Sequence, residues 1–276
     1  MKLVIHCGLH KTGTTSFQKF CFANRLLLRD FGIHYPEYGD QFQHSHVLWE
    51  VQRRGSETLG AYLGECFREA EPDCHTVLLS GEDFENCIAD VALASEIEAL
   101  AHEAGFDAIS WVVVTRPIED YISSLYAEKS KHGVVLSREV VQKAAKERGC
   151  LYLSTVNFNY IFIFDFTRFA KRFRHHVSGQ VIEYDFDSFM VDHPGVVLLR
   201  QLLSEDAFTQ FQAAAEIGKR AENERLNYDQ VEANYVATAL GVERLKSNWF
   251  RPLAAPFIWL RLRKARILQN GSAKSG

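Results

Sequence analysis

The sequence predicts an α/β protein in which a central parallel sheet carries helices on both faces, a three-layer α/β/α arrangement. Short apolar runs rich in β-branched residues recur along the chain, and each is followed by a segment with helical periodicity. This alternation is typical of parallel sheets, whose strands are joined by crossover helices. The runs cover residues 3–7, 76–80, 109–115 and 180–184. Residues 111–114 are continuously apolar, which indicates a central strand that is buried on both faces.

Helical signals lie at residues 14–29, directly after Pro117, at 137–149 and at 157–174. Pro117 suits the first position of a helix because an N–H would have no acceptor there, and two acidic residues follow in the first turn. The last segment is dense in aromatic side chains, which we expect to face the core. These side chains are Phe158, Tyr160, Phe162, Phe164, Phe166, Phe169 and Phe173.

Length and composition bound the class of protein. The 276 residues are 47% hydrophobic, which allows a substantial core, and we expect a single domain over residues 1–250. The net charge of −4 argues against a broad nucleic-acid-binding face, which needs many clustered basic side chains. The six cysteines show no C-x-x-C spacing, so reduced thiols are expected, and no ligand set has the spacing of a zinc site.

The two ends of the chain bear on localisation. The first residues lack the features of a signal peptide, and no run of about eighteen apolar residues occurs, so we expect a cytoplasmic protein. Residues 251–276 form a tail in which apolar and basic residues alternate. The favoured interpretation is a terminal helix that packs on its own domain with a solvated basic face, and in the alternative this basic amphipathic helix makes peripheral contact with an anionic membrane or a partner.

The strongest local signal is a glycine-rich turn between the first strand and the first helix. A turn at this place wraps backbone N–H groups around a phosphate and aims the helix dipole at it. A triphosphate loop of the Walker type needs Gly, four residues and then Gly-Lys-Ser/Thr. Gly8 and Gly13 fit that pattern, but position 14 is Thr and the lysine stands earlier, at Lys11. The turn reads Gly8-Leu9-His10-Lys11-Thr12-Gly13-Thr14-Thr15.

The displaced lysine resembles the 5′-phosphosulfate loop of sulfotransferases that use 3′-phosphoadenosine 5′-phosphosulfate (PAPS), and the string is close to the form seen in bacterial members. The resemblance implies a P-loop NTPase-like fold that binds PAPS without a metal and releases 3′,5′-adenosine bisphosphate. It also implies that Lys11 assists the departure of the phosphate oxygen. An ordinary turn with a solvated lysine is the alternative. The residues expected to bind the donor here are His10, Lys11, Thr12, Gly13, Thr14 and Thr15.

A second motif follows the third strand, where Arg116 precedes Pro117 and Ser124 stands eight residues after the arginine. The proline keeps Arg116 extended, so the arginine lies at the carboxyl end of a strand, where open parallel sheets bind their ligands. Arg-Pro with this serine spacing resembles the 3′-phosphate motif of the same family. The resemblance implies that Arg116 and Ser124 bind the 3′-phosphate and so distinguish PAPS from ATP. In the alternative, Arg116 pairs with Glu119 or Asp120 at the start of the helix.

The second strand ends at Ser80 and is followed by Glu82 and Asp83, which places carboxylates at the same edge of the sheet as the loop. By the same resemblance, Glu82 occupies the position of the catalytic base, which is Glu in carbohydrate-modifying branches of the family. A helix cap is the alternative, because Ser80 and Asp83 have the spacing of a capping box. His46, with His44 beside it, is the rival base because histidine titrates near neutral pH.

Together these motifs predict a sulfotransferase that moves a sulfuryl group from PAPS to a hydroxyl or amine of a small-molecule or glycan acceptor by in-line displacement. The Glu-type base favours a glycan or glycolipid acceptor. Two alternatives remain open. One is a P-loop kinase that uses ATP and Mg²⁺, and the other is a non-catalytic binding protein on the same scaffold. The lack of a lysine at position 14 counts against the kinase.

Overall fold

The computed structural model describes residues 1–39, 41–131, 137–155 and 158–216, together with positions 231, 234, 235 and 256. These residues belong to two compact units. The first consists of Met1–Tyr121 and Ala144–Ala221, and the second of Ile122–Lys143 and Glu222–Gly276. The expected single domain over residues 1–250 stays a prediction. Apart from Pro256, the expected tail lies outside the described residues.

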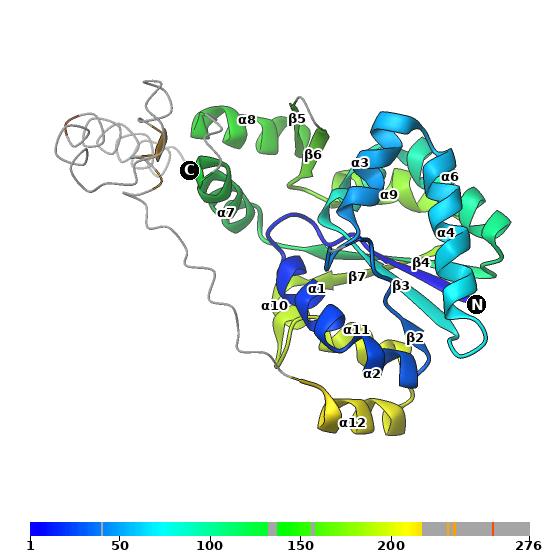
Figure 1. Cartoon of the computed structure of the whole chain (residues 1–276). Coiled ribbons are helices and arrows are strands. Elements are labelled where there is room, and N and C mark those ends of the chain that lie inside the picture. Colours follow the sequence, from blue (N-terminus) through cyan, green and yellow to red (C-terminus); the bar gives the residue numbers. More distant parts are fainter. Residues whose placement is uncertain are drawn as a thin grey trace. The chain divides into compact units, whose positions relative to one another are not determined.

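The first unit is built on a sheet of five parallel strands in the order β2-β3-β1-β4-β7 (Figure 1). The four strands expected from the sequence are present, so the predicted parallel sheet is confirmed. β4 is an interior strand as expected, but β1 holds the middle position. The strands are β1 (Lys2–His6), β2 (Ile33–His34), β3 (Thr76–Ser80), β4 (Ala108–Thr115) and β7 (Gln180–Asp185).

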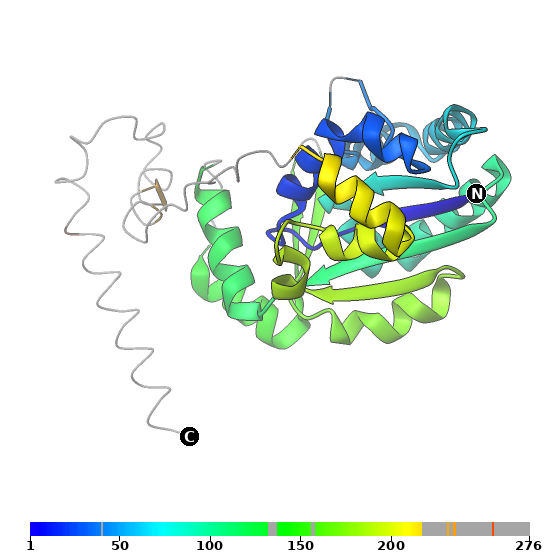
Figure 2. The ribbon, with the colours of Figure 1, turned by 90° about the horizontal axis from the view of Figure 1, so that it is seen from below.

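One face of this sheet is covered by helices from the beginning and the end of the first unit, and Figure 2 shows these helices in front of the strands. Phe17 and Phe189 pack here against the strand residues Val4, Leu78 and Val112 in one buried cluster. Burial of these apolar side chains holds the layer in place. The helices are α1 (Thr14–Ala23), α2 (Arg25–Asp30), α10 (Phe186–Met190), α11 (Val196–Leu202) and α12 (Glu205–Ala214).

The opposite face carries a second layer of helices. Trp111 of β4 is fully buried there, with its ring 5.5 Å from that of Phe173, and its indole N–H donates to Glu98 at 2.7 Å. Glu98 in turn accepts hydrogen bonds from the backbone N–H groups of Ser178 and Gly179, so this buried carboxylate is well satisfied. The helices are α3 (Ser45–Arg54), α4 (Glu57–Ala70), α5 (Glu85–Ala89), α6 (Val91–Ala104) and α9 (Thr167–His176).

The helix expected over residues 14–29 is divided into α1 and α2 at Asn24. The Asn24 amide donates to the carbonyls of Phe20, at 3.0 Å, and Glu216, at 3.1 Å, and its oxygen accepts from the N–H of Glu216 at 2.7 Å. Asparagine competes with helix hydrogen bonds in this way, which explains a break that hydrophobic periodicity does not reveal.

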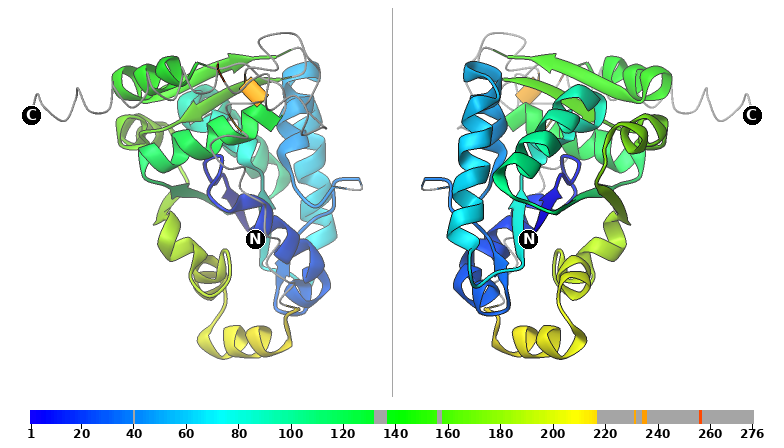
Figure 3. Two further views of the ribbon diagram at one scale, coloured as in Figure 1. Left: turned by 90° about the vertical axis from the view of Figure 1, so that its left-hand side faces the viewer. Right: turned by 90° about the vertical axis from the view of Figure 1, so that its right-hand side faces the viewer.

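The prediction of a helix over residues 157–174 is wrong for the first half of this range. A β-hairpin of β5 (Cys150–Ser154) and β6 (Asn159–Ile163) precedes α9, and its end lies beside α3 (Figure 3), where Asn159 N–H donates to Gln52 at 3.0 Å. The reason is visible in the spacing, because aromatic residues at every second position from 158 to 164 follow the period of a strand. The expected burial holds for Phe158, Phe162, Phe164, Phe166 and Phe173.

The second unit includes α7 (Ile118–Lys131) from Ile122 onward and α8 (Arg138–Arg148) up to Lys143. Both helices were expected. α7 begins directly after Pro117, whose carbonyl accepts from the N–H of Tyr121 at 3.0 Å. Proline therefore starts this helix as its fixed φ and missing N–H predict.

Candidate functional site

The glycine-rich turn joins the carboxyl end of β1 to α1, and its two glycines are required by its shape. Gly13 has φ +82°, and a Cβ there would collide with the sulfur of Met190. A Cβ on Gly8 would lie 2.7 Å from Nε2 of His6 and 2.9 Å from the hydroxyl of Thr14. Lys11 also has a positive φ, of 67°. The backbone therefore curls tightly enough to enclose a small anion.

The start of α1 adds donors to this curl. The N–H groups of Ser16 and Phe17 bond to the Gly13 carbonyl, whereas the earlier N–H groups of Thr14 and Thr15 have no acceptor within the helix. The first turn also contains no acidic side chain that would compete for them. The helix end is thus a suitable anion site.

Arg116 connects the second motif to the loop. Its Nη1 donates to the Lys11 carbonyl at 2.8 Å, and its guanidinium lies 4.4 Å from the centre of the Phe186 ring. Since β1 and β4 are neighbours, the two motifs that the sequence singled out meet at one edge of the sheet. Ser124 lies on α7 in the second unit, so its role toward a 3′-phosphate stays a prediction.

The carboxylates after β3 reach the same edge. A Cβ on Gly81 would lie 2.8 Å from the backbone nitrogen of Ser45, so this turn also needs a glycine. Glu82 has a side chain that is 39% exposed, whereas the Asp83 side chain is 4% exposed. Asp83 accepts from the indole N–H of Trp49 at 2.8 Å.

The helix cap that Ser80 and Asp83 could have formed is absent. The short helix η1 (Glu82–Phe84) begins at Gly81 without a side-chain cap. The Ser80 hydroxyl is bonded to His6 at 2.8 Å instead. His6 is fully buried in the core, and this burial lowers its pKa to about 3.

His10 is turned toward carboxylates. Its Nδ1 lies 2.6 Å from Oε2 of Glu85, and its backbone N–H donates to the same oxygen at 2.8 Å. Its Nε2 lies 3.6 Å from Asp83 Oδ1 and 4.0 Å from Glu82 Oε1. Burial alone would lower the pKa of His10, but the three carboxylates outweigh it and raise the pKa to about 10. This geometry differs from the expectation that His10 binds the donor, because Glu85 engages both its ring and its N–H.

Glu85 is a site residue that the sequence did not reveal. It is fully buried and accepts hydrogen bonds from His10, from the Tyr121 hydroxyl at 3.0 Å and from the Ile163 N–H. Burial, and then the Glu85 charge, raise the pKa of Tyr121 well above its usual range. The partners of Glu85 are 75, 36 and 78 positions away, so no local spacing could have identified them.

The two candidate histidine bases have different surroundings. His44 is buried, accepts at Nδ1 from the Ser80 N–H and donates from Nε2 to the Pro36 carbonyl, both at 2.8 Å. Burial lowers its pKa to about 4, so His44 is a structural residue rather than a base. His46 is half-buried, and its ring lies 4.3 Å from that of Trp49, which places it near Asp83.

The hairpin provides an aromatic wall for the carboxylates. The Phe162 ring lies 4.8 Å from the His10 ring and stacks on Tyr160 at 5.9 Å. Burial, followed by the charges of Asp83 and Glu82, raises the pKa of Tyr160 to about 12. The wall and the acidic residues therefore form one environment beside the loop.

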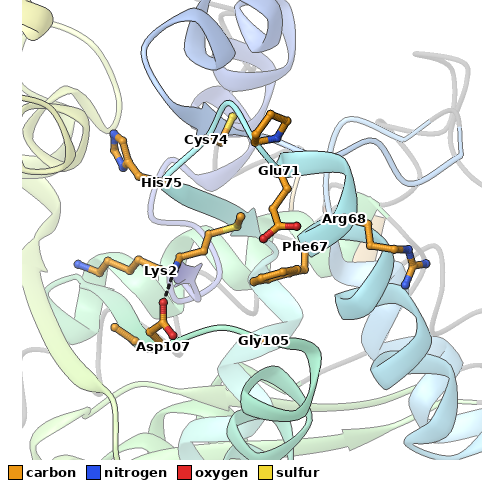
Figure 4. A pocket seen from close by; sticks show the side chains of 11 residues that line it. Lys2, Phe67, Arg68, Glu71, Cys74, His75, Gly105 and Asp107 are labelled. Atoms are coloured by element: carbon orange, nitrogen blue, oxygen red, sulfur yellow. Dashed lines mark hydrogen bonds and ion pairs between the residues drawn. The ribbon is translucent and has the colours of Figure 1, made fainter.

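A pocket with a volume of about 1230 Å³ opens at the opposite edge of the sheet, at the amino ends of the strands (Figure 4). Lys2, His75 and Asp107 line it, and Asp107 is bonded to the amino group of Met1. No residue singled out in the sequence as a site residue lies here. The side chains that line this pocket carry both positive and negative charges, so they favour no single kind of ligand.

Within the described part of the chain, no helix is long and apolar enough to cross a membrane. The same residues contain no group of three or more His, Cys, Asp or Glu side chains arranged to hold a metal ion. The six cysteines all lie in this part and are free thiols.

No family model, curated protein or solved structure matches the chain.

Proposed function

We propose that the protein is a sulfotransferase that transfers a sulfuryl group from PAPS to a hydroxyl or amine, on a P-loop-like fold. The observation that carries the proposal is the hydrogen bond from Arg116 to the Lys11 carbonyl. It joins two separate motifs, each of which resembles one half of a PAPS site, at the carboxyl edge of a parallel sheet. Ligands bind at this edge in open α/β folds.

The residues present fit the donor. The tight turn at Gly8 and Gly13, followed by the N–H groups of Thr14 and Thr15 at the start of a helix, is the kind of backbone cradle that binds phosphate groups such as a 5′-phosphosulfate. PAPS supplies the sulfuryl group and leaves as 3′,5′-adenosine bisphosphate. Arg116, with Ser124 as its predicted partner, selects the 3′-phosphate through the planar fork of its guanidinium.

The transfer requires a base and a cation. Glu82, which is half-exposed beside the loop, accepts the proton of the acceptor as the new bond to sulfur forms. The sulfur–oxygen bond to the donor phosphate breaks, the electron pair stays on the phosphate oxygen, and Lys11 balances the charge that grows there. His46 is the second choice for the base. The positive charge of Lys11 takes the part that a metal has in kinases, so the proposed transfer needs no metal.

We propose a glycan or glycolipid as the acceptor class and the cytoplasm as the location. The Glu-type base supports the acceptor class, and the half-buried Tyr160 ring, which lies near the charges of Asp83 and Glu82, suits the apolar face of a sugar ring. Peripheral membrane contact through residues 251–276 would suit a lipid-linked acceptor.

Transfer of label from radiolabelled PAPS to a panel of neutral sugars and to water tests the proposal. Lys11→Ala and Glu82→Gln should each reduce transfer at least about 100-fold, as the loss of a leaving-group cation or a general base does. Lys171→Ala and Glu103→Gln change the same residue types at exposed positions outside the site and should retain wild-type rates. Equal rates in all five proteins, or no transfer by the wild type, would contradict the proposal.

A further inference from the structure

The two ring nitrogens of His10 both face carboxylate oxygens from different elements. Nδ1 lies 2.6 Å from Glu85 of α5, and Nε2 lies 3.6 Å from Asp83 and 4.0 Å from Glu82 of η1. The ring is only 6% exposed, and water screens the charges of the buried Asp83 and Glu85 poorly, whereas Glu82 is half-exposed. His10 directly precedes Lys11 of the loop.

The hydrogen bonds of Glu85 fix the protonation of Nδ1. This carboxylate is fully buried and receives the Tyr121 hydroxyl and the N–H groups of His10 and Ile163. With donors on both of its oxygens, the Glu85 carboxyl group acts here as a hydrogen-bond acceptor. Nδ1 of His10 therefore carries a hydrogen and donates it to Glu85.

The surroundings of Nε2 lead to the same conclusion for the second nitrogen. Asp83 is 3% exposed, and its Oδ1 has no hydrogen-bond partner among the described residues. If Nε2 were unprotonated, its lone pair would face the oxygens of Asp83 and Glu82, and this arrangement is unfavourable. A hydrogen on Nε2 would instead compensate the negative charge of both carboxylates. The ring is thus an imidazolium. The titratable groups that face it are Glu82, Asp83, Glu85, Tyr121 and Tyr160.

We propose that His10 and Glu85 are a positioning pair that locks the donor loop to the Glu82–Asp83 carboxylates. Glu85 fixes the ring through Nδ1, and Nε2 on the other side of the ring faces the carboxylates of Asp83 and Glu82. The inference rests on the proposed function in one respect, because Glu82 is taken as the base. His10 itself touches neither the donor nor the acceptor. It keeps the residue that accepts the proton in a fixed place relative to Lys11, which stabilises the leaving group.

Nitrogen-15 NMR of labelled histidine tests the pair without any ligand. We expect a His10 signal with both nitrogens protonated at about pH 8, where an ordinary histidine is neutral. The signal is assigned by its loss in His10→Gln and, should that variant not fold, by its shift in Glu82→Gln, which changes a half-exposed side chain. A neutral His10 ring at that pH would overturn the proposal.

A second measurement separates positioning from a simple structural role. His10→Gln retains a donor for Glu85 but removes the charge, and His75→Gln is the matched control at the opposite edge of the sheet (Figure 4). In His10→Gln, affinity for 3′,5′-adenosine bisphosphate should stay within about threefold while turnover of PAPS with water as acceptor falls at least about tenfold. Equal losses of affinity and turnover would overturn the positioning role. If the wild type binds no bisphosphate, the proposed function fails, whereas the NMR result still decides whether the pair exists.

Discussion

At the residue scale, the candidate site combines residues from short sequence motifs with residues whose partners are distant in the sequence. The position of Lys11, Arg116 and Glu82 at the carboxyl edge of the sheet could be predicted from the sequence, because each stands in a short motif at the end of a strand. His10 could be placed in the loop, but not its orientation, since Glu85 lies 75 positions away. The exclusion of His44 as a base also required the fold, because its partners Pro36 and Ser80 come from separate segments.

Trp49 provides a residue-scale prediction. Its indole N–H is a hydrogen-bond donor to the buried Asp83 carboxylate, so Trp49→Phe leaves that oxygen without this donor. We expect the free energy of unfolding to fall by about 1–3 kcal/mol, the usual cost of an unsatisfied buried polar group. Tyr152→Phe, at a side chain that is 59% exposed, is the control and should change stability by less than about 0.5 kcal/mol. Urea denaturation measures both variants, and equal stabilities would show that the Trp49 bond contributes nothing.

At the element scale, the strands were easier to predict than the segments that connect them. The four long parallel strands contain runs rich in apolar and β-branched residues, and each run is followed by a helical segment, so they could be predicted as strands. β2 has only two residues and leaves no pattern. Residues 157–174 combine the period-two spacing of β6 with the helical spacing of α9, and an abundance of aromatic residues conceals the change between them.

Gly195, before α11, allows a prediction about how two elements pack. It has φ +79°, and a Cβ there would collide with the ring of Phe17 on α1, whereas Gly39 has φ +57° and nothing within 4 Å. Both Gly→Ala changes carry the cost of a positive φ, about 1–2 kcal/mol, but Gly195→Ala also disturbs the core. We expect Gly195→Ala to lower the free energy of unfolding by at least about 1 kcal/mol more than Gly39→Ala. Equal losses in chemical denaturation would contradict the packing described between α1 and α11.

At the scale of the whole molecule, buried histidines set the pH dependence of stability. The pKa of His6, about 3, and of His44, about 4, lie below the ordinary value of 6.5, so the unfolded chain takes up protons first in acid. Their contribution is complete above about pH 6.5 and is lost as the pH falls toward about 4. The pKa of His10, about 10, lies above the ordinary value, so its contribution is complete below about pH 6.5 and is lost as the pH rises toward about 10.

These opposite signs predict a maximum in stability near pH 6.5. Urea unfolding at about pH 4.5, 6.5 and 9 measures it, and the loss toward pH 9 should become smaller in His10→Gln. A loss toward pH 9 of the same size in wild type and His10→Gln would show that His10 is not held as an imidazolium.

The alternation of strands and helices predicts the α/β class, because a parallel sheet with helices on both faces buries such strands. The position of the site followed from the same topology, since the loop and Arg116 both end parallel strands that are neighbours. The strand pattern did not predict the contacts between the hairpin and α5, in which the Ile163 N–H donates to Glu85.

The central claim is that the loop and Arg116 form one binding site for a nucleotide with a 3′-phosphate. Calorimetric titration with 3′,5′-adenosine bisphosphate, beside ATP with and without Mg²⁺, tests it most directly on wild type and Arg116→Ala. We predict metal-independent binding of the bisphosphate that Arg116→Ala weakens by about 2 kcal/mol or more, as the loss of a charged hydrogen bond does. No binding of the bisphosphate, or binding of ATP alone and only with Mg²⁺, would contradict the account and favour the kinase alternative in the second case.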